Sequence, residues 1–141
     1  MAKGLGGGLP IGAIVARDAL AALFKPGLHG TTFGGSHLAC AAALTVLAEV
    51  GRSGFIADVA ARGQQLRNGL QRLFPGQEVR GRGLLLGVQL AEAPQKLVIA
   101  ARTEGLIVGP SGGNTLRLAP PLTISEGEVD EVLVRLGRAK G

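Results

Sequence analysis

A lysine near the start of the chain has the surroundings that an amine nucleophile needs. Lys3 is followed by the glycine-rich run Gly4-Leu5-Gly6-Gly7-Gly8 and then by the apolar segment Gly12–Ala16. A lysine amine can form a Schiff base with a carbonyl group once burial or a nearby cation lowers its pKa. Glycine lets the backbone pass close to a flat partner molecule. The segment predicts covalent amine chemistry, although a solvated lysine near a terminus gives the same pattern.

A second segment combines hydroxyl groups with a flexible backbone. It reads His29-Gly30-Thr31-Thr32-Phe33-Gly34-Gly35. Hydroxyl groups beside backbone amides are a usual arrangement for binding phosphate. A plain polar loop, in which threonine forms local turns, has the same composition. Taken alone, the segment leaves both interpretations open.

Arg117 is the third candidate, because it is the one charge in an apolar, strand-like run. The run is Thr115-Leu116-Arg117-Leu118-Ala119-Pro120-Pro121. A planar guanidinium can pair with a carboxylate through two parallel hydrogen bonds. Arg117 is therefore predicted to bind a carboxylate, or else to face water or a structural partner on an edge strand.

In this order the three segments resemble those of class III (ω-amino acid) aminotransferases, especially the acetylornithine branch. The spacing from Lys3 to Thr32 agrees with that family. A fourth stretch, Arg80-Gly81-Arg82-Gly83-Leu84-Leu85-Leu86-Gly87, is similar to the start of the family's small domain, and its two arginines are interpreted as structural. Gly35-Ser36-His37 stands where Gly-Asn-Pro is usual. Ser36 is a good N-cap, so we expect the loop to survive this change.

The resemblance implies a role for each candidate residue. Lys3 would be the catalytic residue and would hold pyridoxal 5'-phosphate. Thr32 would bind the phosphate of the neighbouring subunit's cofactor in a homodimer, and Thr31 would lie near the substrate. Arg117 would bind the α-carboxylate of glutamate or 2-oxoglutarate. The reaction implied is amino transfer from N-acetylornithine to 2-oxoglutarate, a step of arginine biosynthesis, in the cytoplasm.

The expected architecture is α/β, specifically fold type I of the pyridoxal-phosphate-dependent transferases. We expect residues 1–75 to form the end of the large domain with bridging helices, and residues 76–141 to form the small C-terminal α/β domain. Hydrophobic periodicity and turn residues place each element. The expected strands are 11–16, 78–82, 84–90, 106–108 and 115–118, and the expected helices are 18–24, 38–50, 54–74, 94–104 and a last one capped by Ser125 and Glu128.

Composition excludes several other classes of protein. The net charge is +5, but the arginines are scattered and no aromatic platform accompanies them, which argues against nucleic-acid binding. The longest apolar stretch, Leu38–Val50, is too short to span a bilayer. Cys40 is interpreted as buried filler, and neither His29 nor His37 has the acidic or cysteine neighbours that a metal site needs.

Two further expectations concern function. The resemblance covers about the last third of a full-length enzyme, so we expect the isolated chain to be inactive or nearly so. The alternatives are a non-catalytic α/β or dimerisation module, and another ω-transaminase, such as one for 4-aminobutyrate or succinylornithine. The residues that separate these substrates would lie mostly outside this sequence.

Overall fold

The computed structural model describes residues 3–141, with side chains from Gly4 onward, and the chain forms two compact units, 1–55 and 56–141. The boundary expected from sequence lay later, at 75/76. The difference arises because Leu66 and Leu70 of helix α3 (Phe55–Leu73) are fully buried in the core of the second unit. Whether the units correspond to the large and small domains of an aminotransferase stays a prediction.

The first unit has little buried surface. It contains a 3-10 helix, η1 (Lys3–Gly6), a short helix α1 (Asp18–Ala21) and the longer helix α2 (His37–Val50). The segment 11–16, expected to be a buried strand, forms no strand in the structure. Ile14 and Val15 are 82% and 88% exposed, and no strand among the described residues of this unit pairs with the segment.

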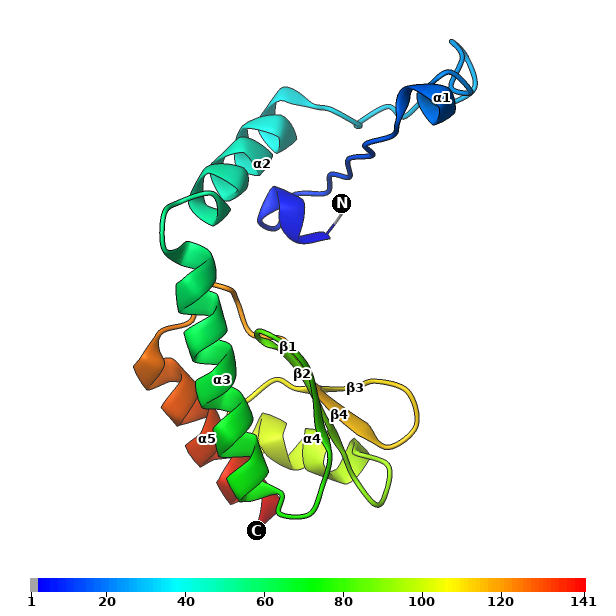
Figure 1. Cartoon of the computed structure of the whole chain (residues 1–141). Helices are drawn as coiled ribbons and strands as arrows, with labels where there is room; N and C mark the ends of the chain where they lie inside the picture. Colours follow the sequence, from blue (N-terminus) through cyan, green and yellow to red (C-terminus); the bar gives the residue numbers. More distant parts are fainter. Residues whose placement is uncertain (1–2) are drawn as a thin grey trace. The chain divides into compact units, whose positions relative to one another are not determined.

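The second unit follows the strand–strand–helix–strand–strand–helix order expected from the sequence (Figure 1). The sheet is antiparallel throughout, in the order β1-β2-β4-β3. The expected strand at 106–108 is wrong by a few residues, since the residues that pair with β4 are Gly109 and Pro110 of β3. The elements after α3 are β1 (Val79–Arg82), β2 (Leu85–Gln89), α4 (Gln95–Thr103), β3 (Gly109–Pro110), β4 (Thr115–Leu118) and α5 (Glu126–Lys140).

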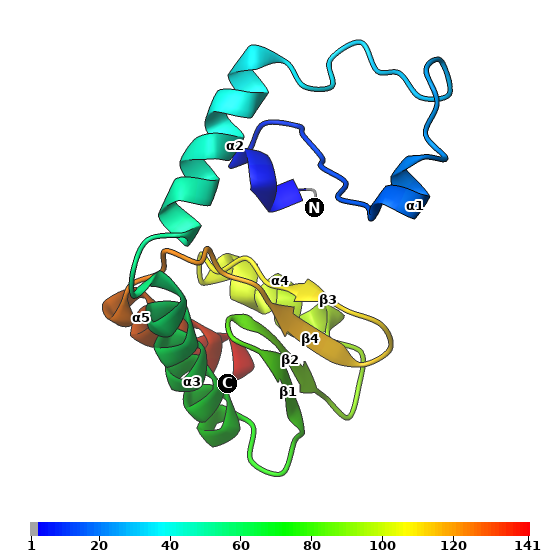
Figure 2. The ribbon, with the colours of Figure 1, turned by 45° about the horizontal axis from the view of Figure 1, so that its top comes forward.

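Alternation along the strands gives the sheet one apolar face. Leu86 and Val88 of β2, with Leu116 and Leu118 of β4, are almost fully buried. They form one core with apolar side chains of α3, α4 and α5, so the helices cover that face of the sheet (Figure 2). Intervening residues such as Leu85 and Arg117 are exposed on the opposite face, which none of the helices of the second unit covers.

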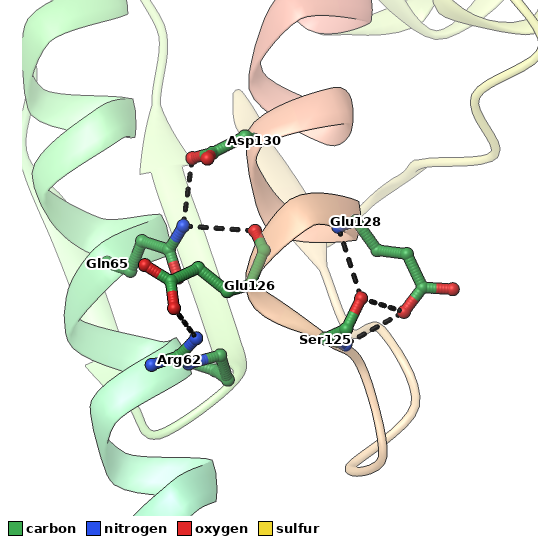
Figure 3. A network of polar contacts seen from close by, with 6 residues as sticks. All are labelled: Arg62, Gln65, Ser125, Glu126, Glu128 and Asp130. Carbon is green, nitrogen blue, oxygen red and sulfur yellow. Dashed lines mark hydrogen bonds and ion pairs between the residues drawn. The ribbon is translucent and has the colours of Figure 1, made fainter.

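Polar contacts join α3 to the start of α5 (Figure 3). Arg62 donates to Glu126 at 2.9 Å, and the amide nitrogen of Gln65 donates to Asp130 at 2.8 Å. The expected capping box is confirmed. The Glu128 backbone N–H donates to Ser125 Oγ at 3.3 Å, and the Glu128 carboxylate accepts from the Ser125 backbone N–H at 2.8 Å.

Two local features of the first unit concern α2 and the turn after it. Gly51, the first residue after α2, has a φ of −79°, and Gly54 takes the left-handed conformation, at +83°. Cys40 is half-buried rather than buried. No single helix among residues 3–141 is long and apolar enough to cross a membrane. Helices α2 and α3 reach the required length and apolar character only when they are taken together, and the chain bends sharply between them.

Candidate functional site

The lysine segment is held by helix α2. Lys3 begins η1, and its side chain lies outside the described residues. η1 packs on α2, and Leu5, Ala39 and Ala43 are buried. At Gly7 a β-carbon would lie only 3.2 Å from Val46 Cγ2. The small residues of this contact let the glycine run approach α2 closely, and so fix the backbone next to Lys3.

The two threonines of the polar loop have different surroundings. Thr31 Oγ1 accepts a hydrogen bond from the Gly34 backbone N–H at 3.2 Å and so closes the turn. The Thr32 side chain is exposed and makes no hydrogen bond to any residue in 3–141. Ser36 stands at the N-cap of α2, as expected, but its side chain makes no capping hydrogen bond. Thr31 therefore shapes the loop, while the Thr32 hydroxyl is free to bind a ligand.

Lys3, Thr31 and Thr32 all belong to the first unit, whereas Arg117 belongs to the second. Within the described part of the first unit, no hydrogen bond connects the loop His29–Gly35 to η1. The loop and the lysine segment are instead related through α2: the loop leads into its first turn, and η1 packs on its side.

Arg117 lies in a row of residues that crosses the sheet. Arg80 on β1 pairs with Gly87 on β2, and Gly87 pairs with Arg117 on β4. Directly paired residues project from the same face, so both arginines belong to the uncovered face with a side-chain-free position between them. An open pocket of about 420 Å³ occupies this place and is also lined by Thr115 and Ser111.

Arg80 is bound by its neighbours on that face. Its Nη2 donates to Thr115 Oγ1 at 2.8 Å and to Gln89 Oε1 at 3.1 Å, and its Nη1 donates to Glu78 at 3.3 Å. Thr115 Oγ1 in turn donates to Gln89 Oε1 at 3.0 Å. Three strands contribute to this network, and the Thr115 side chain within it is buried.

Arg117 has the opposite character. It is exposed, and its guanidinium makes no hydrogen bond or ion pair with any described residue. One of its terminal nitrogens lies 3.8 Å from where a β-carbon on Gly109 would be, so the side chain extends over β3. A guanidinium that has no protein acceptor and lines a pocket is placed to receive a carboxylate from outside.

The residues present suit part of a pyridoxal 5'-phosphate site. The group offers a carbonyl to a lysine amine and a phosphate to hydroxyl and amide donors. The free Thr32 hydroxyl, in a glycine-rich loop just before the N-terminus of α2, is a donor of that kind. Among the described residues no three His, Cys, Asp or Glu side chains gather to hold a metal ion.

Arg80 was interpreted from the sequence as a structural residue, but its hydrogen-bond network was not predicted. Gly87 and Thr115 were likewise not identified as neighbours of Arg117. The alternation of apolar residues in β2 and β4 indicates which face Arg117 occupies. The register that sets Arg80 opposite Gly87 is visible only in the folded sheet.

Comparison with known proteins supports one family. The family profile "Aminotransferase class-III" matches residues 1–139. Acetylornithine aminotransferase from Caldanaerobacter subterraneus subsp. tengcongensis is 46% identical over 94% of this chain and 35% of its own length. The enzyme of that name from Thermosynechococcus vestitus is 45% identical over 98% of this chain and 35% of its own.

Solved structures agree with the sequence comparison. The crystal structure of acetylornithine aminotransferase from Elizabethkingia anophelis superposes with a TM-score of 0.75 and 31% identity, over 89% of this chain and 35% of that one. An ornithine aminotransferase from Toxoplasma gondii is described as having partial occupancy of PLP at its active site. Its structure superposes with a TM-score of 0.76 and 33% identity, over 87% of this chain and 31% of that one.

These matches define how far the likeness extends. The chain spans about a third of the length of the relatives it matches, and the match runs through all three candidate segments. The fold expected from the sequence is confirmed by the same neighbours. This chain belongs to the class III aminotransferases.

Proposed function

We propose that the protein containing this chain transfers the amino group of N-acetylornithine to 2-oxoglutarate, using pyridoxal 5'-phosphate. The observation that carries the proposal is the exposed Arg117, which lines a pocket and has no acceptor among the described residues. Both substrates carry an α-carboxylate that such a guanidinium can bind. The names of the relatives support the choice of N-acetylornithine.

In this proposal the residues of the chain have separate tasks. Lys3 carries the cofactor and moves a proton at the amine-bearing carbon of the substrate. Thr32 donates its hydroxyl to the phosphate of the cofactor in a neighbouring subunit, and Thr31 keeps the loop in shape beside the substrate. Arg117 orients the substrate by its carboxylate. The cofactor itself, when bound, stabilises negative charge that develops on that carbon.

We also propose a homodimer, a cytoplasmic location and little or no activity for the 141 residues alone. The first unit leaves many apolar side chains in water, which a partner surface would cover. Examples are Ile14, Val15, Leu23, Phe33 and Leu44, each more than half exposed.

A chimera tests the function directly. The first two-thirds of the Caldanaerobacter enzyme would be joined to this chain, and glutamate formation from N-acetylornithine and 2-oxoglutarate would be measured. We expect activity that requires added pyridoxal 5'-phosphate and is lost in Lys3→Ala. Activity with ornithine or 4-aminobutyrate in place of N-acetylornithine would change the substrate assignment. An inactive chimera that is folded and dimeric would favour a non-catalytic module.

A further inference from the structure

The acceptor groups near Arg117 on the uncovered face of the sheet are already engaged. Glu78, Gln89 and Thr115 each accept a hydrogen bond from Arg80. Gln89 is the diagonal neighbour of Arg117 in the register of β2 and β4, and Thr115 is two residues away on the same strand. Long side chains reach such diagonal and same-face positions. Without Arg80, Arg117 would have protein acceptors within its reach.

Charge on this face also favours an anion. Arg80 and Arg117 both line the pocket, and Glu78, the acidic side chain in the network, is paired with Arg80. Gly87 between them adds no side chain, so the space between the two guanidinium groups stays open. A β-carbon there would lie 2.9 Å from Thr115 Cγ2. The pocket therefore combines a bound arginine and a free one, with a gap between them.

From this geometry we infer that Arg80 is a positioning residue for the carboxylate site at Arg117. Arg80 occupies Glu78, Gln89 and Thr115, so that Arg117 stays unpaired, and it adds a second positive charge beside the bound anion. The inference rests on the proposed role of Arg117 in binding the substrate carboxylate. It adds a residue that acts on the ligand through its neighbours.

The test is a titration of the full 15N-labelled chain with disodium glutarate, followed by NMR. Sodium chloride keeps the ionic strength constant, so that general screening does not contribute. We expect the largest shifts at the amides of Gly87 and Arg117 and at the Arg117 side-chain Nε–H.

Four variants separate this inference from the proposed function. Arg117→Gln should weaken glutarate binding by about tenfold or more, since the contacting group is lost. Arg80→Gln should weaken it roughly fivefold, because one nearby charge is removed and acceptors are released. Arg80→Lys should fall between Arg80→Gln and the unchanged chain. Arg82→Gln removes the same charge from the same strand outside the pocket, and should leave the affinity unchanged.

Each outcome has a defined meaning. Unchanged affinity in Arg80→Gln, or an equal loss in Arg82→Gln, would overturn the inference while leaving the role of Arg117 intact. Unchanged affinity in Arg117→Gln would overturn that role as well. The Arg117 Nε–H signal of folded Arg80→Gln, measured without ligand, gives a further check. If Arg80 were purely structural, this signal would stay where it is in the unchanged chain. If the substitution releases acceptors that Arg117 can reach, the signal should shift. If Arg80→Gln does not fold, Arg80→Lys decides, and an unaltered affinity there contradicts the inference.

Discussion

Gly69 of α3 lies directly against Leu133 of α5, with no room for a methyl group between them. A β-carbon on Gly69 would be 2.9 Å from Leu133 Cγ and closer still to both of its methyl carbons. Glycine costs a helix interior about 1 kcal/mol relative to alanine. Its presence in α3 is explained by this close approach of the two helices.

Gly69→Ala should therefore destabilise the protein although alanine is the better helix former. Overpacking of this kind costs about 1–3 kcal/mol, so the net loss in the free energy of unfolding should be about 1 kcal/mol. Gly137→Ala is the matched control, because a β-carbon on Gly137 would lie 3.4 Å from Leu73 Cδ2, an ordinary contact. Urea unfolding measures both variants. Equal stability changes in the two would show that Leu133 moves aside freely.

Arg67 connects α3 to strand β1 through hydrogen bonds, and its removal should weaken that contact. Its guanidinium donates to the carbonyl oxygens of Val79 at 2.6 Å and Gly81 at 2.7 Å. Arg67→Met keeps most of the aliphatic stem but loses both hydrogen bonds, which should cost about 1–3 kcal/mol. Arg72→Met in the same helix is the control, since Arg72 has no polar partner among the described residues. A similar loss in both would contradict the prediction.

The capping box makes stability depend on pH in the acid range. Hydrogen bonds from the backbone N–H and then the hydroxyl of Ser125 lower the pKa of Glu128 below its ordinary value. The unfolded chain then binds this proton more tightly than the folded one, so the stabilisation is present above the unfolded pKa. It is lost as the pH falls through the folded pKa.

Glu128→Gln keeps the reach of the side chain without the titration, because glutamine also forms a capping box. In thermal melts from neutral to acid pH, the unsubstituted chain should lose more stability than Glu128→Gln. Parallel curves for the two proteins would mean that the hydrogen bonds to Ser125 do not favour the ionised carboxylate.

The order of the elements in the second unit was predictable, because each carries its own local signals. The Ser125–Glu128 capping box and the apolar alternation of Leu84–Leu90 each involve only a few neighbouring residues, so they can be recognised in the sequence. The failed strand at Ile11–Ala16 depends instead on a neighbouring strand to accept its hydrogen bonds, which no local pattern supplies. The roles of Arg80 and Gly87 depend on register, and a slip of either strand by one residue would have moved its own residue to the other face.

The chain should be unequally resistant to proteases. The described side chains from Pro10 to Leu38 are all exposed or nearly so, whereas the second unit has a continuous apolar core. Limited trypsin digestion should therefore cut first after Arg17, since Pro26 blocks cleavage after Lys25, and leave a resistant product that contains residues 56–141. Mass spectrometry of the early products measures this. First cuts after Arg102 or Arg117 would contradict the prediction.

Thr31 and Thr32 should differ in their effect on the cofactor. In the chimera, Thr32→Val should raise the dissociation constant for pyridoxal 5'-phosphate about tenfold, because one hydrogen bond to a charged phosphate is lost. The loop should keep its shape, since no described residue bonds the Thr32 hydroxyl. Thr31→Val removes the acceptor of the Gly34 N–H and should disturb the loop itself.

Two readouts distinguish the threonines. Cofactor affinity is followed by the visible absorbance of the bound group, and loop shape by amide hydrogen exchange at Gly34. Thr32→Val should change the first and leave the second unaltered, whereas Thr31→Val should speed exchange at Gly34. Normal cofactor affinity in Thr32→Val would remove Thr32 from the proposed phosphate site, because its free hydroxyl would then have no ligand to bind.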